Sequence, residues 1–130
     1  MNKSIILSIL KSTIFPMSEL RSLTEQYVSA FHSKDLLAIA VLMAEDFTLT
    51  DPSVSSLGPR EKALQYIKEL FDNNPSLTFK AHKILVDAPY SALHFAITLN
   101  GTIYDGVDMI AWMEGKMTSI HAYLTPRLED

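Results

Sequence analysis

The chain has 130 residues, enough for one domain that buries roughly two-thirds of the surface its unfolded form exposes. Hydrophobic residues make up 48% and charged residues 20%, which excludes a disordered chain and favours a substantial core. The net charge of −4 and the lack of a basic run make nucleic acid and anionic membranes poor partners. There is no cysteine, which excludes disulfides and cysteine-ligated metal sites and fits a cytoplasmic protein.

Residues 1–16 are predicted to form an N-terminal extension, helical in part, before a single domain over residues 17–130. Apolar residues recur at helical spacing in this extension: Ile5, Ile6, Ile9, Leu10 and Ile14. Lys11 interrupts the apolar run, and no small-x-small cleavage site follows it, so an amphipathic helix is favoured over a secretion signal. No segment reaches the ~20 apolar residues that a membrane span requires.

Three helices are predicted in the next part of the chain. The first begins at Ser18 and runs to about Ser33, with Tyr27 on its apolar, inward-facing stripe. The second, near residues 35–44, is apolar almost all round, so we expect it to be deeply buried. A short strand over residues 47–50 follows. Gly58-Pro59 and Glu61 then mark the start of a third helix that ends near Asp72.

Alternating apolar and polar residues from Ser76 onward indicate four long strands, over about 76–86, 90–100, 102–113 and 116–124. Asn100-Gly101 is a strong hairpin signal and Glu114-Gly115 a weaker one. These turns predict an antiparallel meander. Helices followed by such a sheet give an α+β fold in which the helices cover one face.

Three potential proton-handling residues stand out in this apolar chain. Asp51 follows the strand at 47–50, Tyr27 lies on the first helix, and Asp108 interrupts an apolar strand. Moving a proton next to a carbonyl needs a base near the carbon and donors at the oxygen, and these side chains could supply both. Structural interpretations stay open: Asp51 could form a turn, Tyr27 could be a satisfied core tyrosine, and Asp108 could face solvent or a dimer contact.

Several sequence pieces carry a family resemblance: Glu25-Gln26-Tyr27-Val28, Ala44 to Pro52, Gly58, Gly106 to Ile110, and Gly115-Lys116 through to Tyr123. On these pieces the chain resembles the nuclear-transport-factor-two-like (SnoaL-like) superfamily, and within it most resembles the ketosteroid isomerases. The resemblance implies a cone-shaped, cystatin-like α+β barrel, with three helices packed in the concave face of a curved, mostly antiparallel sheet. It also implies that Asp51 is the catalytic base, that Tyr27 and Asp108 donate hydrogen bonds to the substrate oxygen, and that Tyr66 supports Tyr27.

Strand parity predicts the wall of a hydrophobic pocket. If Asp108 points inward, the inward positions near it are Phe95, Ile97, Ile110, Trp112, Ala122 and Leu124. The resemblance adds Met43, which replaces a tyrosine found in some isomerases. Such a wall predicts a small hydrophobic carbonyl ligand. The opposite parity places four residues on the outer face, where we expect a homodimer contact: Met109, Ala111, His121 and Tyr123.

No cofactor or metal is expected. The four histidines are scattered without paired spacing, and we expect them at the surface or an interface. There are 4 glycines and no phosphate-binding glycine motif, which disfavours a nucleotide cofactor. The predicted function is therefore a cofactor-independent, ketosteroid-isomerase-like proton shift through an enolate or dienolate. Two alternatives stay open: a polyketide-cyclase-like reaction, and a noncatalytic module that binds a hydrophobic ligand or dimerises.

Overall fold

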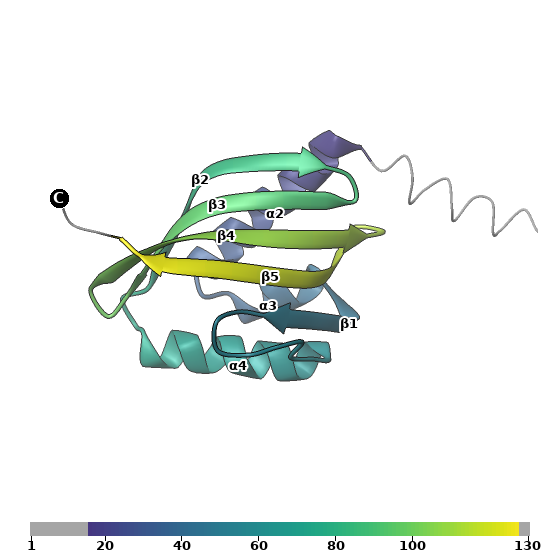
Figure 1. Cartoon of the computed structure of the whole chain (residues 1–130). Helices are drawn as coiled ribbons and strands as arrows, with labels where there is room; N and C mark the ends of the chain where they lie inside the picture. Colours follow the sequence, from purple (N-terminus) through teal and green to yellow (C-terminus); the bar gives the residue numbers. More distant parts are fainter. Residues whose placement is uncertain (1–15, 128–130) are drawn as a thin grey trace, which may run out of the picture.

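The computed structural model describes residues 16–127, where helices lie against one face of a single five-stranded sheet (Figure 1). The helices are α2 (Met17–His32), α3 (Leu36–Val41) and α4 (Arg60–Asn73). The strands are β1 (Met43–Thr50), β2 (Thr78–Asp87), β3 (Tyr90–Leu99), β4 (Thr102–Met113) and β5 (Lys116–Pro126). The predicted α+β fold is thus confirmed. The helix expected within residues 1–16 falls outside the described residues, apart from Pro16 at the start of α2.

The sheet has the strand order β1-β5-β4-β3-β2. Strands β2 to β5 form the predicted antiparallel meander, and β1 joins its edge parallel to β5. Both predicted hairpin turns are present, and each uses two residues with positive φ: Asn100 (49°) with Gly101 (85°), and Glu114 (50°) with Gly115 (77°). Two successive positive φ angles match the twist of the flanking strands, so these turns fix the register that brings Asp108 beside Leu93 and Ala122.

Helix α2 forms where it was expected. It buries residues three or four positions apart, which face the sheet: Leu20, Thr24, Tyr27, Ala30 and Phe31. Helix α3 departs from its prediction, because Leu37 is 81% and Val41 65% exposed, while Ile39 is fully buried. The helix is six residues long and one side of it packs on α2 and α4, so deep burial of all its faces was a wrong expectation.

Strand β1 begins at Met43, earlier than predicted, and ends at Thr50. A register irregularity separates Met43, opposite Met117, from Thr48, opposite Ser119. The parallel pairing with β5 brings Thr50 beside His121, so the next residue, Asp51, leaves the sheet next to Ala122 on β5. None of the described helices is long and apolar enough to cross a membrane.

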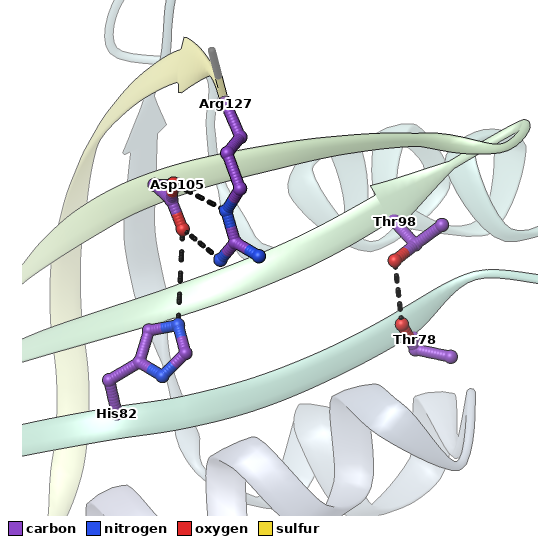
Figure 2. Close-up of polar contacts among 5 residues, drawn as sticks. All are labelled: Thr78, His82, Thr98, Asp105 and Arg127. Carbon is purple, nitrogen blue, oxygen red and sulfur yellow. Dashed lines mark hydrogen bonds and ion pairs between the residues drawn. The ribbon is translucent and has the colours of Figure 1, made fainter. Parts of the chain in front are cut away.

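A polar cluster lies away from the helices, where Arg127 meets Asp105 (Figure 2). The Arg127 Nε and Nη2 atoms donate to the Asp105 carboxylate over 2.9 and 2.6 Å, and His82 Nε2 lies 3.9 Å from the same carboxylate. These hydrogen bonds lower the pKa of Asp105. Thr78 and Thr98 share a 3.0 Å hydrogen bond between β2 and β3. The hydrogen bonds from Arg127 to Asp105 therefore link the residue that follows β5 to β4.

Candidate functional site

A cavity lies between the helices and the inner face of the sheet, with about 540 Å³ of space, its open mouth included. Most of the wall is apolar: Phe31, Phe47, Leu49, Ile67, Leu70, Phe79, Phe95, Ile97, Ile120, Ala122 and Leu124. The remaining lining residues are Tyr27, Asp51, Tyr66 and Asp108. The fold thus brings all four predicted polar site residues around one cavity.

Tyr27 and Asp108 form the deep end of the cavity, where each is only 3% exposed. Burial, with a smaller contribution from the negative charge of Asp51, raises the pKa of Asp108 to about 8. Burial, with a smaller contribution from Asp108, holds the pKa of the Tyr27 phenol well above its usual value. Both groups therefore keep their protons at neutral pH, and both can donate a hydrogen bond.

The two donors at the deep end do not bind each other. Within residues 16–127 the raised pKa values of both groups come from burial and charge, and no hydrogen bond joins the Tyr27 hydroxyl to the Asp108 carboxyl. No fully buried side-chain oxygen or nitrogen in these residues lacks a hydrogen-bond partner, so neither group is an unsatisfied donor sealed in the core. Both line the cavity, where a ligand oxygen can accept their hydrogen bonds.

Asp51 lies nearer the mouth and is held by several donors. Its Oδ1 atom accepts hydrogen bonds from the backbone N–H groups of Ser53 (2.7 Å) and Val54 (3.0 Å). Its Oδ2 atom accepts one from the Tyr66 hydroxyl (2.8 Å). The turn interpretation and the pocket interpretation of Asp51 therefore both apply, because the carboxylate caps the turn after β1 and also lines the cavity.

Tyr66 differs from what the resemblance implied. Its hydroxyl donates to Asp51, whereas it was expected to support Tyr27. The cause lies in packing, since α4 carries Tyr66 and lies along β1, whereas α2 carries Tyr27 and lies on β2 (Figure 1). Burial, followed by the hydrogen bond to Asp51, raises the pKa of Tyr66 to about 12.

Four of the seven predicted wall residues line the cavity, namely Phe95, Ile97, Ala122 and Leu124. Met43, Ile110 and Trp112 do not, although all three are buried. Ile110 and Trp112 have the right parity but lie further along β4. Met43 lies at the start of β1, whereas Asp51 follows its other end. The Trp112 indole instead donates to the Ser91 hydroxyl (2.9 Å), which is also hydrogen-bonded to Thr24 (2.9 Å).

The sequence reasoning missed the aromatic part of the wall. The ring of Phe79 packs against the rings of Phe31 and Phe95 in tilted pairs, with ring centroids 4.6 and 4.7 Å apart. Phe31 follows Tyr27 by one helical turn and Phe79 has inward parity on β2, so periodicity was the available signal. A wall of this kind favours a flat, apolar ligand.

Metal-binding side chains do not cluster in the described part of the chain. No three histidine, aspartate or glutamate side chains between residues 16 and 127 lie close enough to hold a metal ion. All four histidines are exposed.

The cavity between the helices and the concave sheet defines a cone-shaped α+β barrel of the nuclear-transport-factor-two-like class, a fold shared with solved structures of that name. The chain belongs to the SnoaL-like domain family, whose model matches residues 24–120. That match includes Tyr27, Asp51, Tyr66 and Asp108. No curated protein matches the chain.

Solved structures of diverse proteins share this fold. A protein from Kribbella flavida, provisionally named a ketosteroid isomerase, has a TM-score of 0.77 at 20% identity, with 88% of this chain and 83% of that chain covered. A provisional SnoaL-like polyketide cyclase from Jannaschia sp. has a TM-score of 0.75 at 13% identity (84% and 88% covered). An epoxide hydrolase from M. tuberculosis has a TM-score of 0.70 at 13% identity (84% of each). Identities this low establish the fold, so function must be argued from the site.

Proposed function

We propose that the protein is a cofactor-independent enzyme that shifts a proton next to the carbonyl of a small hydrophobic compound. The observation that carries the proposal is the contrast between two aspartates lining one apolar cavity. Asp51 accepts three hydrogen bonds near the mouth, while burial raises the pKa of Asp108 to about 8. Environments that separate two carboxyl groups in this way assign one to proton acceptance and the other to hydrogen-bond donation.

In the proposed reaction Asp51 moves the proton, while Tyr27 and Asp108 bind the carbonyl oxygen. Asp51 takes a proton from the carbon beside the carbonyl, and the electrons of the broken C–H bond move toward the carbonyl oxygen to form an enolate or dienolate. Tyr27 and Asp108 donate hydrogen bonds to that oxygen as its charge grows. Asp51 then returns the proton to a different carbon. The ketosteroid isomerases keep an acid protonated for this purpose, so the role of Asp108 is carried over from the resemblance.

A noncatalytic ligand-binding module is the second candidate, and one observation favours it. Two of the three hydrogen bonds to Asp51 come from the backbone of its own turn, which is an ordinary structural role for aspartate. A polyketide-cyclase-like reaction would use the same carboxylate as base. It differs from an isomerase in the substrate and not in the proton acceptor.

We also propose that the protein forms a homodimer through the outer face of the sheet. Tyr123 is 56% exposed and stacks on His121, with ring centroids 4.6 Å apart, and Met109 is exposed beside them. Apolar side chains gathered on an outer sheet face favour a protein contact. Light scattering at micromolar concentration should give twice the monomer mass, and a monomer would contradict this assembly.

Exchange of hydrogen for deuterium next to a carbonyl tests the catalytic proposal without knowledge of the substrate. The full chain is incubated in heavy water with a panel of apolar ketones, including a β,γ-unsaturated ketosteroid, and exchange is followed by mass spectrometry. We expect exchange with at least one ketone. The Asp51→Asn variant should lower its rate roughly 10²- to 10⁴-fold, while binding of a naphthol, a flat apolar phenol, stays unchanged.

Asp46→Asn is the matched control, because Asp46 is an exposed acid on β1 that does not line the cavity. This variant should exchange ketone hydrogens at the native rate. If the native chain exchanges no ketone and the naphthol binds equally to native and Asp51→Asn protein, catalysis is refuted and the binding module stands.

A further inference from the structure

The hydrogen bonds around Asp51 leave one part of its carboxylate free. An ionised carboxylate has about four acceptor sites, two on each oxygen. The backbone N–H groups of Ser53 and Val54 occupy both sites of Oδ1, at 2.7 and 3.0 Å. The Tyr66 hydroxyl occupies one site of Oδ2, at 2.8 Å. One acceptor site therefore remains, on the same oxygen that Tyr66 contacts.

We infer that Tyr66 is a positioning residue that directs the proton to the remaining acceptor site of Asp51 Oδ2. The inference rests on the proposed function, because it describes how the same base works. Tyr66 and Asp51 both line the cavity. A bound ligand therefore meets the carboxylate whose Oδ2 atom keeps this free acceptor site. Without the phenol, Oδ2 would offer two acceptor sites, and the proton could arrive in two geometries.

Tyr66 also affects how firmly Asp51 holds a transferred proton. When the C–H bond breaks, its electrons stay with the enolate and a new O–H bond forms on Oδ2. Tyr66 keeps its own proton throughout, because burial and the Asp51 hydrogen bond raise its pKa to about 12. A phenol binds a carboxylate more strongly than a carboxylic acid, so its hydrogen bond weakens as Oδ2 is protonated. This change favours return of the proton to carbon.

Among the titratable groups that line the cavity in the described structure, Tyr66 is the one placed to orient Asp51. Asp108 on β4 and Tyr27 on α2 line the same cavity as Asp51, and burial keeps both protonated through their raised pKa values. Within residues 16–127, no lysine, arginine or histidine belongs to the cavity lining. Of these side chains, Tyr66 on α4 is the one hydrogen-bonded to Asp51.

The test compares the native full chain with Tyr66→Phe, which removes one oxygen and keeps the ring. The carboxyl carbon of Asp51 is labelled with ¹³C and its chemical shift is measured at neutral pH, with no substrate present. Loss of the donor should move this chemical shift, because the carboxylate loses the 2.8 Å hydrogen bond. A ring-fluorinated tyrosine at position 66, a stronger donor, should move the chemical shift in the opposite direction. Tyr90→Phe, at an exposed tyrosine on β3, is the matched control and should change nothing.

Turnover of a ketone that exchanges hydrogen supplies the second readout. For Tyr66→Phe we expect kcat to fall about tenfold with KM little changed, since poorer alignment of the base acts on the reacting geometry. An unmoved ¹³C chemical shift of Asp51 in Tyr66→Phe would overturn the inference even if kcat fell. Absence of turnover in the native chain would instead defeat the proposed function, and the chemical shift would still decide whether Tyr66 acts on Asp51.

Discussion

Each end of the cavity holds an aspartate and a tyrosine, but the two ends differ in burial and in hydrogen bonding. At the mouth, an aspartate and a tyrosine are partly exposed and joined by a 2.8 Å hydrogen bond. At the deep end, Asp108 and Tyr27 are buried and no hydrogen bond joins them in the described structure. The carboxylate at the mouth is therefore held by hydrogen bonds, whereas burial at the deep end disfavours charge. In the proposed reaction, position more than residue type decides which group accepts a proton and which donates a hydrogen bond.

The largest expected effect is on the pH dependence of stability. The pKa of Asp108 is raised by burial from 3.8 to about 8, so between these values the folded chain keeps a proton that the unfolded chain has lost. Rising pH then favours the unfolded chain, and Asp108 lowers the free energy of unfolding by roughly 1.4 kcal/mol per pH unit in this window. Above about pH 8 its contribution is constant. Urea unfolding between pH 4 and 9 measures this slope.

Asp108→Asn should remove that slope and become more stable than the native chain as pH rises. Asp46→Asn, at an exposed position, should keep the native slope. If the free energy of unfolding changed with pH in parallel for native and Asp108→Asn protein, Asp108 would be charged in the folded chain. The contrast between the two ends of the cavity would then be lost.

Sequence reasoning predicted the deep end of the cavity better than the mouth. Helical periodicity and strand parity are local patterns: the first correctly placed Tyr27 on the inward face of its helix, and the second grouped Asp108 with the cavity residues Phe95 and Ala122. The partner of Tyr66 depends on how α4 lies along β1, which no local pattern encodes, and the expected bond to Tyr27 was wrong. Parity also could not tell how far along β4 the cavity extends. For that reason Trp112 was assigned to the pocket although it bonds Ser91 in the core.

The next largest effect is expected for Tyr27→Phe. If Tyr27 donates to the developing oxyanion, turnover should fall about a hundredfold, near the lower range for loss of one such donor. Stability should change by less than about 0.5 kcal/mol, because within residues 16–127 the hydroxyl has no hydrogen-bond partner to lose. Ketone exchange and urea unfolding measure the two quantities. Tyr66→Phe, which does break a hydrogen bond, should be the less stable of the two variants. The reverse order would contradict the contrast between the ends.

A smaller effect should follow from narrowing the cavity at Gly106 on β4. A Cβ atom there would lie 2.6 Å from both the Phe95 ring and the Tyr123 carbonyl oxygen. Because the carbonyl belongs to the backbone, Gly106→Ala should destabilise the fold by roughly 1–3 kcal/mol and push Phe95 toward the cavity. Naphthol binding, followed by calorimetry, should weaken. Gly101→Ala is the control: it strains a turn with φ of 85° but meets open space, so it should cost stability and leave binding unchanged.

The smallest effect concerns communication between the two aspartates. Burial is the first cause of the raised pKa of Asp108, and the charge of Asp51 comes second. Asp51→Asn removes that charge, so the pKa of Asp108 should fall below about 8 yet stay far above 3.8, because its burial is unchanged. The ¹³C shift of the Asp108 carboxyl carbon measures this directly. A fall into the ordinary range would mean that repulsion from Asp51, and not the apolar surroundings, keeps Asp108 protonated. The deep end could then donate a hydrogen bond only while Asp51 is charged, and donation would weaken once Asp51 had taken the proton from the substrate.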